Sequence, residues 1–265
     1  MTEIPDSHPR KSSLLSREKM VEASKRGLLA DSAMIAHGRG EAFDYLLGER
    51  TSASASVAIR EAAARLLSAT NPIISMNGNS TVLAGTEAIK IATMIGCPIE
   101  VNIYYRTEER MRGLVRELES QKEILIACSP PEEHDAISGV EILGLVSDGR
   151  IPGLEGPRSY CSARGIEKAD VVLVPLEDGD RCEALVGLGK QVIAIDLNPL
   201  SRTSRTATVT IVDEVSRALS GIVDELTGKP NPGEWDNDLA LKDALEVMCS
   251  CLLYTSDAAD EPSSV

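Results

Sequence analysis

Apolar residues in the first 70 positions recur at helical spacing. Between Ser16 and about Leu29, charged and apolar residues alternate as in an amphipathic helix, and residues 53–69 are rich in Ala, Leu and Arg, which favour helix. Residues 35–45 lie between these stretches and hold two glycines around an arginine, which predicts a loop leading into a helix. Residues 1–70 are therefore predicted to form a mainly helical N-terminal segment.

After residue 70 the pattern changes to short aliphatic runs separated by stretches with one apolar helical face. Each run has the length and composition of a buried strand. Strands that alternate with helices indicate an α/β fold, with a mainly parallel sheet and helices on both faces. The predicted strands are residues 73–76, 101–105, 124–128, 171–174, 192–195 and 209–212. The helical faces are formed by Met111, Leu114, Val115 and Leu118, and later by Val215, Leu219, Ile222, Val223 and Leu226.

The C-terminal pattern defines the expected domain limits. Residues 1–252 are predicted to form one α/β domain, with a sheet core over 71–227 and a last helix over 238–252. Leu241, Leu245, Met248 and Leu252 share one face of that helix, which we expect to dock on the domain. Residues 253–265 lose the periodicity and become small and acidic, so we interpret them as a disordered and non-native tail.

Composition narrows the function classes. The formal charge of −14 disfavours a nucleic-acid-binding surface, which needs clustered cations. No run approaches the eighteen apolar residues of a membrane span, and the N-terminus lacks the apolar core of a signal peptide, so a cytoplasmic protein is expected. The six cysteines and three histidines lack the spacing of a metal site. Any anionic substrate must therefore be bound by local arginines.

Polar side chains crowd the position where the predicted strand 171–174 ends. Asp178, Gly179, Asp180 and Arg181 follow this strand and precede a helix predicted to begin near Glu183. Backbone amides at a helix N-terminus favour anions, and the two aspartates could hold Mg²⁺ or a ribose hydroxyl. The alternative is an Asp-Gly turn that merely caps the helix.

The next predicted strand, 192–195, ends in a similar cluster. Asp196 could accept a hydrogen bond from a ribose or hold metal-bound water, Asn198 could bind a base or phosphate, and Arg202 could pair with a phosphate. Leu197 lies between the two polar positions. The alternative is structural, because Asn-Pro starts a turn and Ser201 could cap the following turn.

An asparagine pair follows the first predicted strand. Asn77 and Asn79 flank one glycine before a helix near Ser80, an arrangement that fits anion binding. Neither the dinucleotide-binding fingerprint nor a Walker phosphate loop occurs in the sequence. After the second predicted strand, Arg106 and Arg110 are expected on one helical face, either to bind an anion or as solvated charges.

The N-terminal segment supplies further cations. Arg17 and Arg39 could clamp phosphates, since guanidinium groups match phosphate oxygens and the glycines beside Arg39 permit close approach. His37 could act as an acid or base, but a satisfied, partly buried imidazole is the favoured interpretation. No Gly-x-Ser-x-Gly elbow supports a hydrolytic triad.

Several of these stretches together resemble one family, the archaeal 4-phosphopantoate:β-alanine ligases, or phosphopantothenate synthetases. The resemblance is weak over residues 129–163 and fades after about residue 252. The matching stretches are residues 4–10, 16–18, 37–45, 77–79, 105–110, 169–181 and 195–203.

The resemblance implies a Rossmann-like homodimer in coenzyme A biosynthesis. It would join 4-phosphopantoate to β-alanine with ATP and Mg²⁺, giving 4′-phosphopantothenate, AMP and pyrophosphate through an acyl-adenylate. The ATP contacts it implies are Arg17, Arg39, Asp178, Gly179, Asp180, Arg181, Asp196, Leu197, Asn198 and Arg202, of which Arg39, Asp180 and Arg181 are the catalytic candidates and Asp178 and Asp180 the magnesium candidates. The candidate phosphopantoate contacts are Asn77, Asn79, Arg106 and Arg158.

Two other functions fit the same residues. One is a non-catalytic, nucleotide-binding regulatory domain, because a fold does not fix a function. The other is a phosphosugar-handling enzyme that uses the anion site at residues 77–79 without ATP. Release of AMP that depends on both substrates would distinguish the ligase from either alternative.

Overall fold

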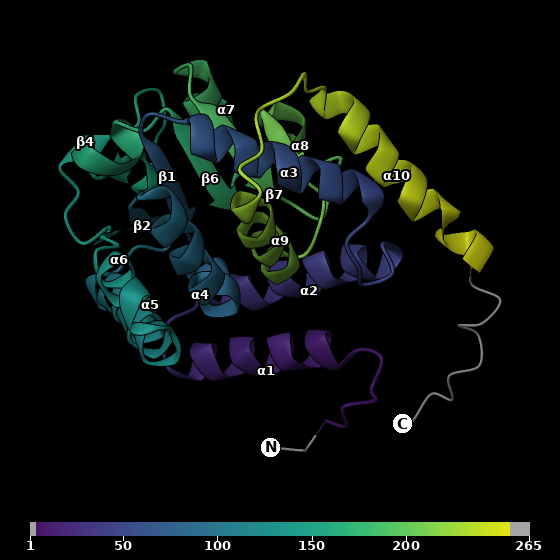
Figure 1. Cartoon of the computed structure of the whole chain (residues 1–265), viewed down its shortest axis with the longest axis horizontal. Helices are drawn as coiled ribbons and strands as arrows, with labels where there is room; N and C mark the ends of the chain where they lie inside the picture. The colour runs from purple at the N-terminus through teal and green to yellow at the C-terminus, as the bar shows by residue number, and fades with distance from the viewer. Residues whose placement is uncertain (1–3, 255–265) are drawn as a thin grey trace.

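The structure, a computed structural model, describes residues 4–254 and is built around a six-stranded sheet (Figure 1). Every pairing in this sheet is parallel, and the strand order is β3-β2-β1-β6-β7-β8. The strands are β1 (Pro72–Met76), β2 (Ile99–Val101), β3 (Ile142–Leu143), β6 (Val171–Pro175), β7 (Gln191–Ile195) and β8 (Val209–Ile211), and a separate antiparallel pair is formed by β4 (Gly149–Arg150) and β5 (Tyr160–Cys161).

Helices cover both faces of the sheet, as the sequence pattern predicts. The helices α3, α4, α5 and α9 pack on one face, and α7, α8 and the segment around β4 and β5 cover the other. The helices are α1 (Lys11–Lys25), α2 (Asp31–Leu46), α3 (Ala53–Ser68), α4 (Gly78–Ile95), α5 (Glu108–Cys128), α6 (His134–Ser138), α7 (Gly179–Gly187), α8 (Arg202–Thr206), α9 (Val215–Thr227) and α10 (Asn237–Tyr254).

The two core layers follow from the alternation of side chains along each strand. Leu173 and Ile193 face the layer of α3, α4 and α9, whereas Val172 and Val192 face the layer of α7. All four side chains are fully buried. Strands covered on both faces must be apolar on both, which is why β6 and β7 are near-continuous aliphatic runs.

The helical faces predicted from the sequence are confirmed. In α5, Met111, Leu114, Val115 and Leu118 are the buried residues. In α9, Val215, Leu219, Ile222 and Leu226 are buried and Val223 is half-buried.

The C-terminal helix docks on the body of the protein. Leu241 and Ala244 of α10 are buried against Leu47, Leu197 and Val212. The predicted face is correct in part, because Leu245 and Met248 are only half-buried. Helix α10 extends to residue 254, two residues beyond its predicted end, and the rest of the predicted tail, 255–265, lies outside the described residues.

Two predicted strands are wrong. Residues 124–128 form the last turns of α5, so the aliphatic run Ile124–Ile126 belongs to an amphipathic helix and not to a strand. The strand predicted over 101–105 has the wrong bounds, because β2 ends at Val101. The Asn102 N–H still donates to Met76 O at 2.9 Å, and its side chain donates to Tyr160 O at 3.0 Å. The sheet has six strands because residues 142–143 add β3 at its edge.

The glycine-flanked segment at residues 35–45 is helical, and the prediction of a loop there is wrong. Helix α2 runs through both glycines, and Gly40 faces Leu197 so closely that a Cβ would lie 3.4 Å from its side chain. A small residue at position 40 therefore lets the helix approach the end of β7. Figure 1 shows α1 and α2 lying side by side below the sheet.

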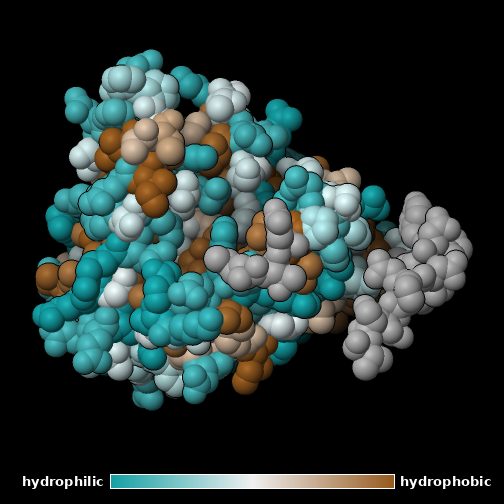
Figure 2. Space-filling model, turned by 90° about the horizontal axis from the view of Figure 1, so that it is seen from below, coloured by the Kyte–Doolittle hydropathy of each residue, from teal (hydrophilic) through white to brown (hydrophobic). Residues whose placement is uncertain are grey.

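Surface polarity matches the acidic composition. Figure 2, which views the molecule from below, shows apolar side chains scattered among hydrophilic ones rather than joined in one large patch. No helix within residues 4–254 combines the length and apolar character needed to span a bilayer.

Candidate functional site

The strand order reverses between β1 and β6. From β1 the chain proceeds outward to β2 and β3, and it then returns through β6 to β7 and β8 on the other side. Ligands of open parallel sheets bind outside the carboxyl ends of the strands at such a reversal. The loops that follow β1, β6, β7 and β8 at this edge are therefore the candidate site.

Asn77 fixes the turn after β1. Its side-chain oxygen accepts the Ser80 N–H at 3.0 Å and caps α4, while its Nδ2 donates to Leu176 O at 2.7 Å and Pro175 O at 3.2 Å. Leu176 has a φ of 60°, an unusual value for a residue other than glycine. Asn77 therefore locks the β1 turn to the β6 turn, and this contact holds the reversal point together.

Asn79 is the second residue of α4. Its side chain is buried, and Nδ2 donates to Ala33 O at 3.0 Å. The bond fixes the first turn of α2 over the end of β1. Both asparagines of the predicted anion site thus have structural bonds of their own.

Two arginines meet one buried carboxylate at the reversal point. The Glu177 side chain is fully buried, and its two oxygens separate Arg158, whose Nη1 lies 2.6 Å from Oε1, from Arg181, which pairs with Oε2. Arg181 is 1% exposed, and its Nη2 donates to Ser75 Oγ at 3.0 Å. Burial lowers the pKa of Arg181, and Glu177 opposes this shift. Glu177 is thus shared by two guanidinium groups, and Arg158 has Asp178 as a second carboxylate partner.

Arg158 presents a free donor at this point. Its Nε donates to Asn102 Oδ1 at 3.2 Å and its Nη1 to Asp178 Oδ2 at 2.8 Å. Its Nη2 is buried and has no hydrogen-bond partner within residues 4–254. A buried guanidinium N–H without an acceptor is costly, so this atom is suited to bind an anion.

The turn after β6 is not the simple helix cap that was the alternative interpretation. Helix α7 begins at Gly179, four residues earlier than predicted, and Asp178 at its N-cap makes no side-chain cap bond. The Asp178 carboxylate pairs with Arg158 instead. The N–H groups of the first turn of α7 are therefore not capped by this aspartate.

Arg181 is buried between this turn and the sheet and is not exposed on the turn's surface. A side chain that is 1% exposed and bonded to Ser75 and Glu177 supports the turn from below. Its predicted role as an ATP contact and catalytic group therefore becomes a positioning role in this conformation, because no face of its guanidinium reaches solvent.

Asp180 and Arg202 form an exposed pair across the turns after β6 and β7. Arg202 bonds Asp180 and also reaches Glu183 Oε1 at 2.7 Å. A Cβ at Gly179 would lie 2.9 Å from the Arg202 side chain. The absence of a side chain at position 179 thus allows Arg202 to lie against the start of α7.

The turn after β7 is shaped by Asp196. Its Oδ1 accepts the Asn198 N–H at 2.9 Å and its Oδ2 accepts the Ser201 hydroxyl at 2.5 Å, while Ser201 caps α8. Burial raises the pKa of Asp196, and these hydrogen bonds and Arg39 oppose the shift. The structural alternative for this turn is therefore confirmed, and Leu197 is buried against α2 and α10.

Arg17 and Arg39 approach from the N-terminal helices. Arg17 on α1 lies 2.7 Å from Glu41 Oε1 on α2 and is 46% exposed, so one side of its guanidinium faces solvent. Burial would raise the pKa of Glu41, but hydrogen bonds from Arg17 and Ser13 lower it below its usual value. Arg39 is exposed, and its positive charge lowers the pKa of Asp196 in the turn after β7.

Arg106 does not share a helical face with Arg110, because α5 begins only at Glu108. Its Nη2 donates to Gly144 O at 2.6 Å and to Ser147 Oγ at 2.5 Å. These two bonds tie Arg106 to the loop after β3. Burial lowers its pKa.

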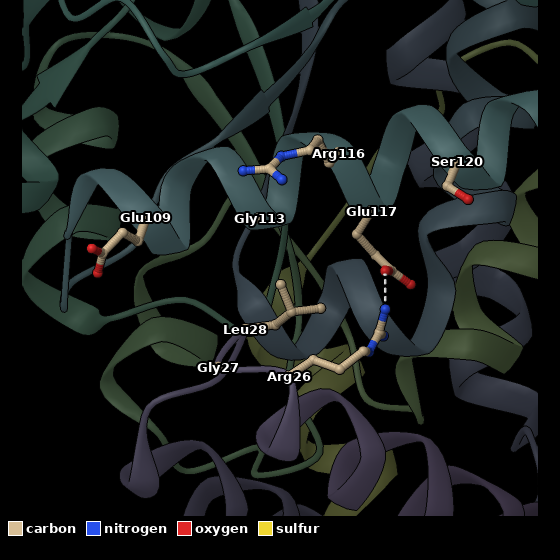
Figure 3. A pocket seen from close by; sticks show the side chains of 8 residues that line it. All are labelled: Arg26, Gly27, Leu28, Glu109, Gly113, Arg116, Glu117 and Ser120. Atoms are coloured by element: carbon tan, nitrogen blue, oxygen red, sulfur yellow. Dashed lines mark hydrogen bonds and ion pairs between the residues drawn. The ribbon is translucent and has the colours of Figure 1, made fainter.

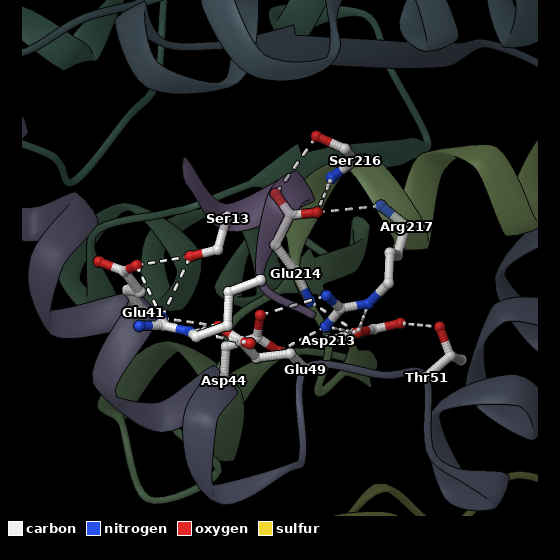
Figure 4. Close-up of polar contacts among 10 residues, drawn as sticks. Ser13, Glu41, Asp44, Glu49, Thr51, Asp213, Glu214, Ser216 and Arg217 are labelled. Atoms are coloured by element: carbon white, nitrogen blue, oxygen red, sulfur yellow. Dashed lines mark hydrogen bonds and ion pairs between the residues drawn. The ribbon is translucent and has the colours of Figure 1, made fainter. Parts of the chain in front are cut away.

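The turn after β8 holds a polar network that the motif analysis missed (Figure 4). Arg217 on α9 bridges Asp44 of α2, with Nη1 3.1 Å from Oδ2, and Asp213, with Nη2 2.6 Å from Oδ1. Glu214 caps α9 through the N–H groups of Ser216 and Arg217. Polar residues directly after the predicted strand 209–212 were the signal that could have identified this network.

The predicted magnesium ligands are separated by their arginine partners. Asp178 pairs with Arg158, and Asp180 pairs with Arg202. The described residues contain no group of three or more His, Cys, Asp or Glu side chains that could hold a metal ion. Magnesium commonly binds through one or two carboxylates and the phosphates of a nucleotide, which is the arrangement these aspartates would fit.

A surface cleft of about 600 Å³ lies beside this edge, between the α1–α2 turn and α5 (Figure 3). The Arg26–Glu117 ion pair, at 2.7 Å, spans it. The cleft contains none of the predicted site residues, so we assign the site to the strand ends instead. It is lined by Arg26, Gly27, Leu28, Glu109, Gly113, Arg116, Glu117 and Ser120.

Comparison with known proteins identifies the family. Residues 54–246, which include every strand and the loops at the reversal point, match the family model described as phosphopantothenate/pantothenate synthetase. The chain belongs to the phosphopantothenate/pantothenate synthetase family. Arg17 and Arg39 precede the matched segment, whereas Arg158 and Glu177 lie within it.

Named relatives of this synthetase family match over most of their length. The chain is 47% identical over 255 residues to a 4-phosphopantoate--beta-alanine ligase of Thermococcus kodakarensis, covering 92% of each protein. It is 46% identical over 262 residues to the enzyme of the same name from Methanospirillum hungatei, covering 96% of this chain and all of the relative. A Methanosarcina mazei protein of that name is 48% identical over 84% of this chain and 81% of the relative.

Proposed function

We propose that this chain joins 4-phosphopantoate to β-alanine in coenzyme A biosynthesis, using ATP and releasing AMP and pyrophosphate. Membership of the synthetase family and 46–50% identity to the named ligases support this proposal. The observation that carries it is Arg158, a buried guanidinium with a free donor at the reversal point of the sheet. A phosphate or carboxylate of the substrate suits the unpartnered Nη2 donor of this guanidinium.

We assign the 4-phosphate of phosphopantoate to Arg158. Glu177 and Asp178 bond Nη1, and Asn102 bonds Nε. These contacts fix the plane of the guanidinium and therefore the orientation of its remaining donor, Nη2. A guanidinium that three groups already hold in place loses little conformational entropy when it binds a phosphate. Asn77 and Asn79 then contribute by holding the surrounding turns, and Arg106 would approach from the loop after β3.

ATP would lie along the turns after β6 and β7. Arg17 and Arg39 face this edge from the N-terminal helices, and the uncapped first turn of α7 offers backbone N–H groups and the positive end of a helix dipole. Arg202 and Asp180 are exposed on the same side. Asp178 and Asp180 would support Mg²⁺ bound mainly by the nucleotide phosphates, where the ion would neutralise the developing charge.

The chemistry needs positioning rather than a covalent nucleophile. The phosphopantoate carboxylate attacks the α-phosphorus of ATP, pyrophosphate leaves, and the β-alanine amine then displaces AMP from the acyl carbon. Fixed arginines at the turns would stabilise the charge that develops on the phosphate oxygens and hold the reactants in line. Carboxylate oxygen labelled with ¹⁸O should appear in AMP, and its appearance in inorganic phosphate instead would refute an acyl-adenylate.

Kinetics of an Arg158→Met variant test the substrate assignment. Loss of a charge-assisted hydrogen bond costs about 1.5–3 kcal/mol, so KM for 4-phosphopantoate should rise roughly 10- to 100-fold while KM for ATP stays near the parent value. The preference for 4-phosphopantoate over pantoate should fall by the same factor. Arg164→Met is the matched control, because Arg164 is exposed and pairs only with Glu141 at 3.0 Å. A higher KM for ATP alone would refute the assignment.

Oligomeric state and location complete the proposal. We infer a homodimeric cytoplasmic enzyme from the family resemblance, and light scattering of the purified protein would test the dimer.

A further inference from the structure

Helix α2 crosses the carboxyl ends of several strands. Ala33 O accepts the bond from Asn79 at the end of β1, and Gly40 packs on Leu197 after β7. Asp44 pairs with Arg217 beyond the end of β8. These contacts, at positions 33, 40 and 44, define the face of α2 that is turned toward the sheet.

His37 lies on that same face, four residues after Ala33 and three before Gly40. It is half-buried, and its Nε2 is buried without any hydrogen-bond partner among residues 4–254. The satisfied imidazole favoured from the sequence is therefore not what the structure contains. A buried ring nitrogen that lacks a partner is available to a ligand.

Three charged groups face His37 from three elements. Glu41 lies one turn along α2, Glu214 lies at the N-cap of α9, and Arg17 extends from α1. Burial lowers the pKa of His37 and outweighs the two carboxylates, which raise it, while Arg17 lowers it further. The imidazole is therefore neutral at pH 7, and a ring nitrogen can accept a proton.

Glu214, whose charge acts on His37, is fixed by backbone hydrogen bonds. Its Oε2 accepts the N–H groups of Ser216 at 2.9 Å and Arg217 at 3.1 Å, so its carboxylate is held by the first turn of α9. Figure 4 shows Glu214 and Glu41 within the same polar network. Glu41 is paired with Arg10 and Arg17, whereas Glu214 has no ion-pair partner among residues 4–254. Glu214 is therefore the carboxylate near the imidazole that attracts an ammonium group.

We propose that His37 is the base that deprotonates the ammonium group of β-alanine, and that Glu214 attracts this ammonium to it. This proposal rests on the proposed function. The ammonium transfers one proton to His37, and the neutral amine then attacks the acyl carbon of the adenylate. A C–N bond forms, the C–O bond to AMP breaks, and AMP leaves with the electron pair. The nitrogen loses its second proton to solvent, and His37 later releases the first.

The two half-reactions separate this proposal from the proposed function. Pyrophosphate exchange into ATP, with 4-phosphopantoate and without β-alanine, reports adenylate formation alone. In a His37→Gln variant this exchange should equal that of the parent, whereas kcat/KM for β-alanine at pH 7 should fall about 100- to 1,000-fold, the usual effect of losing a general base. No exchange in the parent would refute the adenylate in the proposed function rather than the role of His37.

Hydroxylamine distinguishes a base from a structural residue. It is uncharged at pH 7 and needs no base to become a nucleophile, so His37→Gln should form the hydroxamate of phosphopantoate at the parent rate. His134→Gln is the matched control, because the ring of His134 is bonded to Ser129 O at 3.0 Å. Equal losses with β-alanine and hydroxylamine, or no loss with β-alanine, would overturn the proposal.

The pH profile and a second variant provide independent tests. In the parent, kcat/KM for β-alanine should decrease as the pH falls through a pKa below 6.5, where His37 gains a proton, and His37→Gln should lack this decrease. If His37→Gln does not fold, Glu214→Gln tests the same site, because glutamine keeps an oxygen that can cap α9. It should raise KM for β-alanine and leave pyrophosphate exchange unchanged, and an unchanged KM would contradict the proposal.

Discussion

Replacement of Glu177 by glutamine removes the one negative charge that separates two buried arginines. The Glu177 side chain is 0% exposed, and the side chains of Arg158 and Arg181 are 7% and 1% exposed. Glutamine keeps the shape but has one amide oxygen in place of two carboxylate oxygens, so the Arg181 guanidinium keeps only neutral hydrogen-bond partners such as the Ser75 hydroxyl. Breaking a buried ion pair by removing one partner costs about 3–5 kcal/mol, because the remaining charge stays buried and uncompensated.

The expected loss is measurable by calorimetry. For a chain of this size, each kcal/mol lowers the melting temperature by about 2–4 °C, so Glu177→Gln should melt roughly 6–20 °C below the parent. Glu183→Gln is the matched control, since Glu183 is exposed and pairs with an exposed arginine, and its melting temperature should equal that of the parent. The double variant Glu177→Gln/Arg181→Met should recover part of the loss, because it removes the unpaired charge.

One result would refute this reasoning. If Glu177→Gln melts within about 2 °C of the parent, the buried arginines do not depend on this carboxylate, and the rigid support assigned to Arg158 is absent. The KM for 4-phosphopantoate of the same variant provides a second readout. It should rise together with the loss of stability, because Arg158 would lose one of the groups that hold its Nη1.

Three further predictions concern the surrounding turns. Arg217→Met leaves two buried carboxylates without a counter-ion, so chemical denaturation should show a loss of about 3–5 kcal/mol. Gly179→Ala should raise KM for ATP without lowering the melting temperature, since the new methyl group displaces Arg202. Burial would raise the pKa of Asp170, but backbone N–H donors lower it, so its stabilisation is complete above pH 4 and lost on further acidification. Asp170→Asn should therefore melt below the parent at pH 7, and the difference should shrink as the pH is lowered through the reduced pKa of Asp170.

Much of the sheet and its functional edge could be predicted from the sequence. The runs that form β6 and β7 are aliphatic on both faces, and those that form β1 and β8 are interrupted only by Ser75 and Thr210, a pattern that surface helices do not show. Because parallel strands deliver their carboxyl ends to one edge, the polar residues after these runs could be assigned to one site. The same rule, applied to the strand ending at Ile211, would also have identified Asp213 and Glu214.

The remaining features depend on tertiary contacts. The run at 124–128 is too short for its periodicity to distinguish a strand from the end of a helix. Glycines at positions 38 and 40 indicate a loop by propensity, but packing against Leu197 stabilises the helix. The burial of Arg181 under Glu177 also follows only from the fold, because an arginine in a polar motif is normally exposed.

The most direct test of the central claim is AMP release from ATP by the purified full-length chain. The proposed function predicts AMP and pyrophosphate in a 1:1 ratio with 4′-phosphopantothenate, identified by mass spectrometry, only when 4-phosphopantoate and β-alanine are both present. Replacement of 4-phosphopantoate by pantoate should lower kcat/KM, since pantoate lacks the phosphate assigned to Arg158. ATP binding without substrate-dependent AMP release, or AMP release without formation of the amide, would contradict the claim.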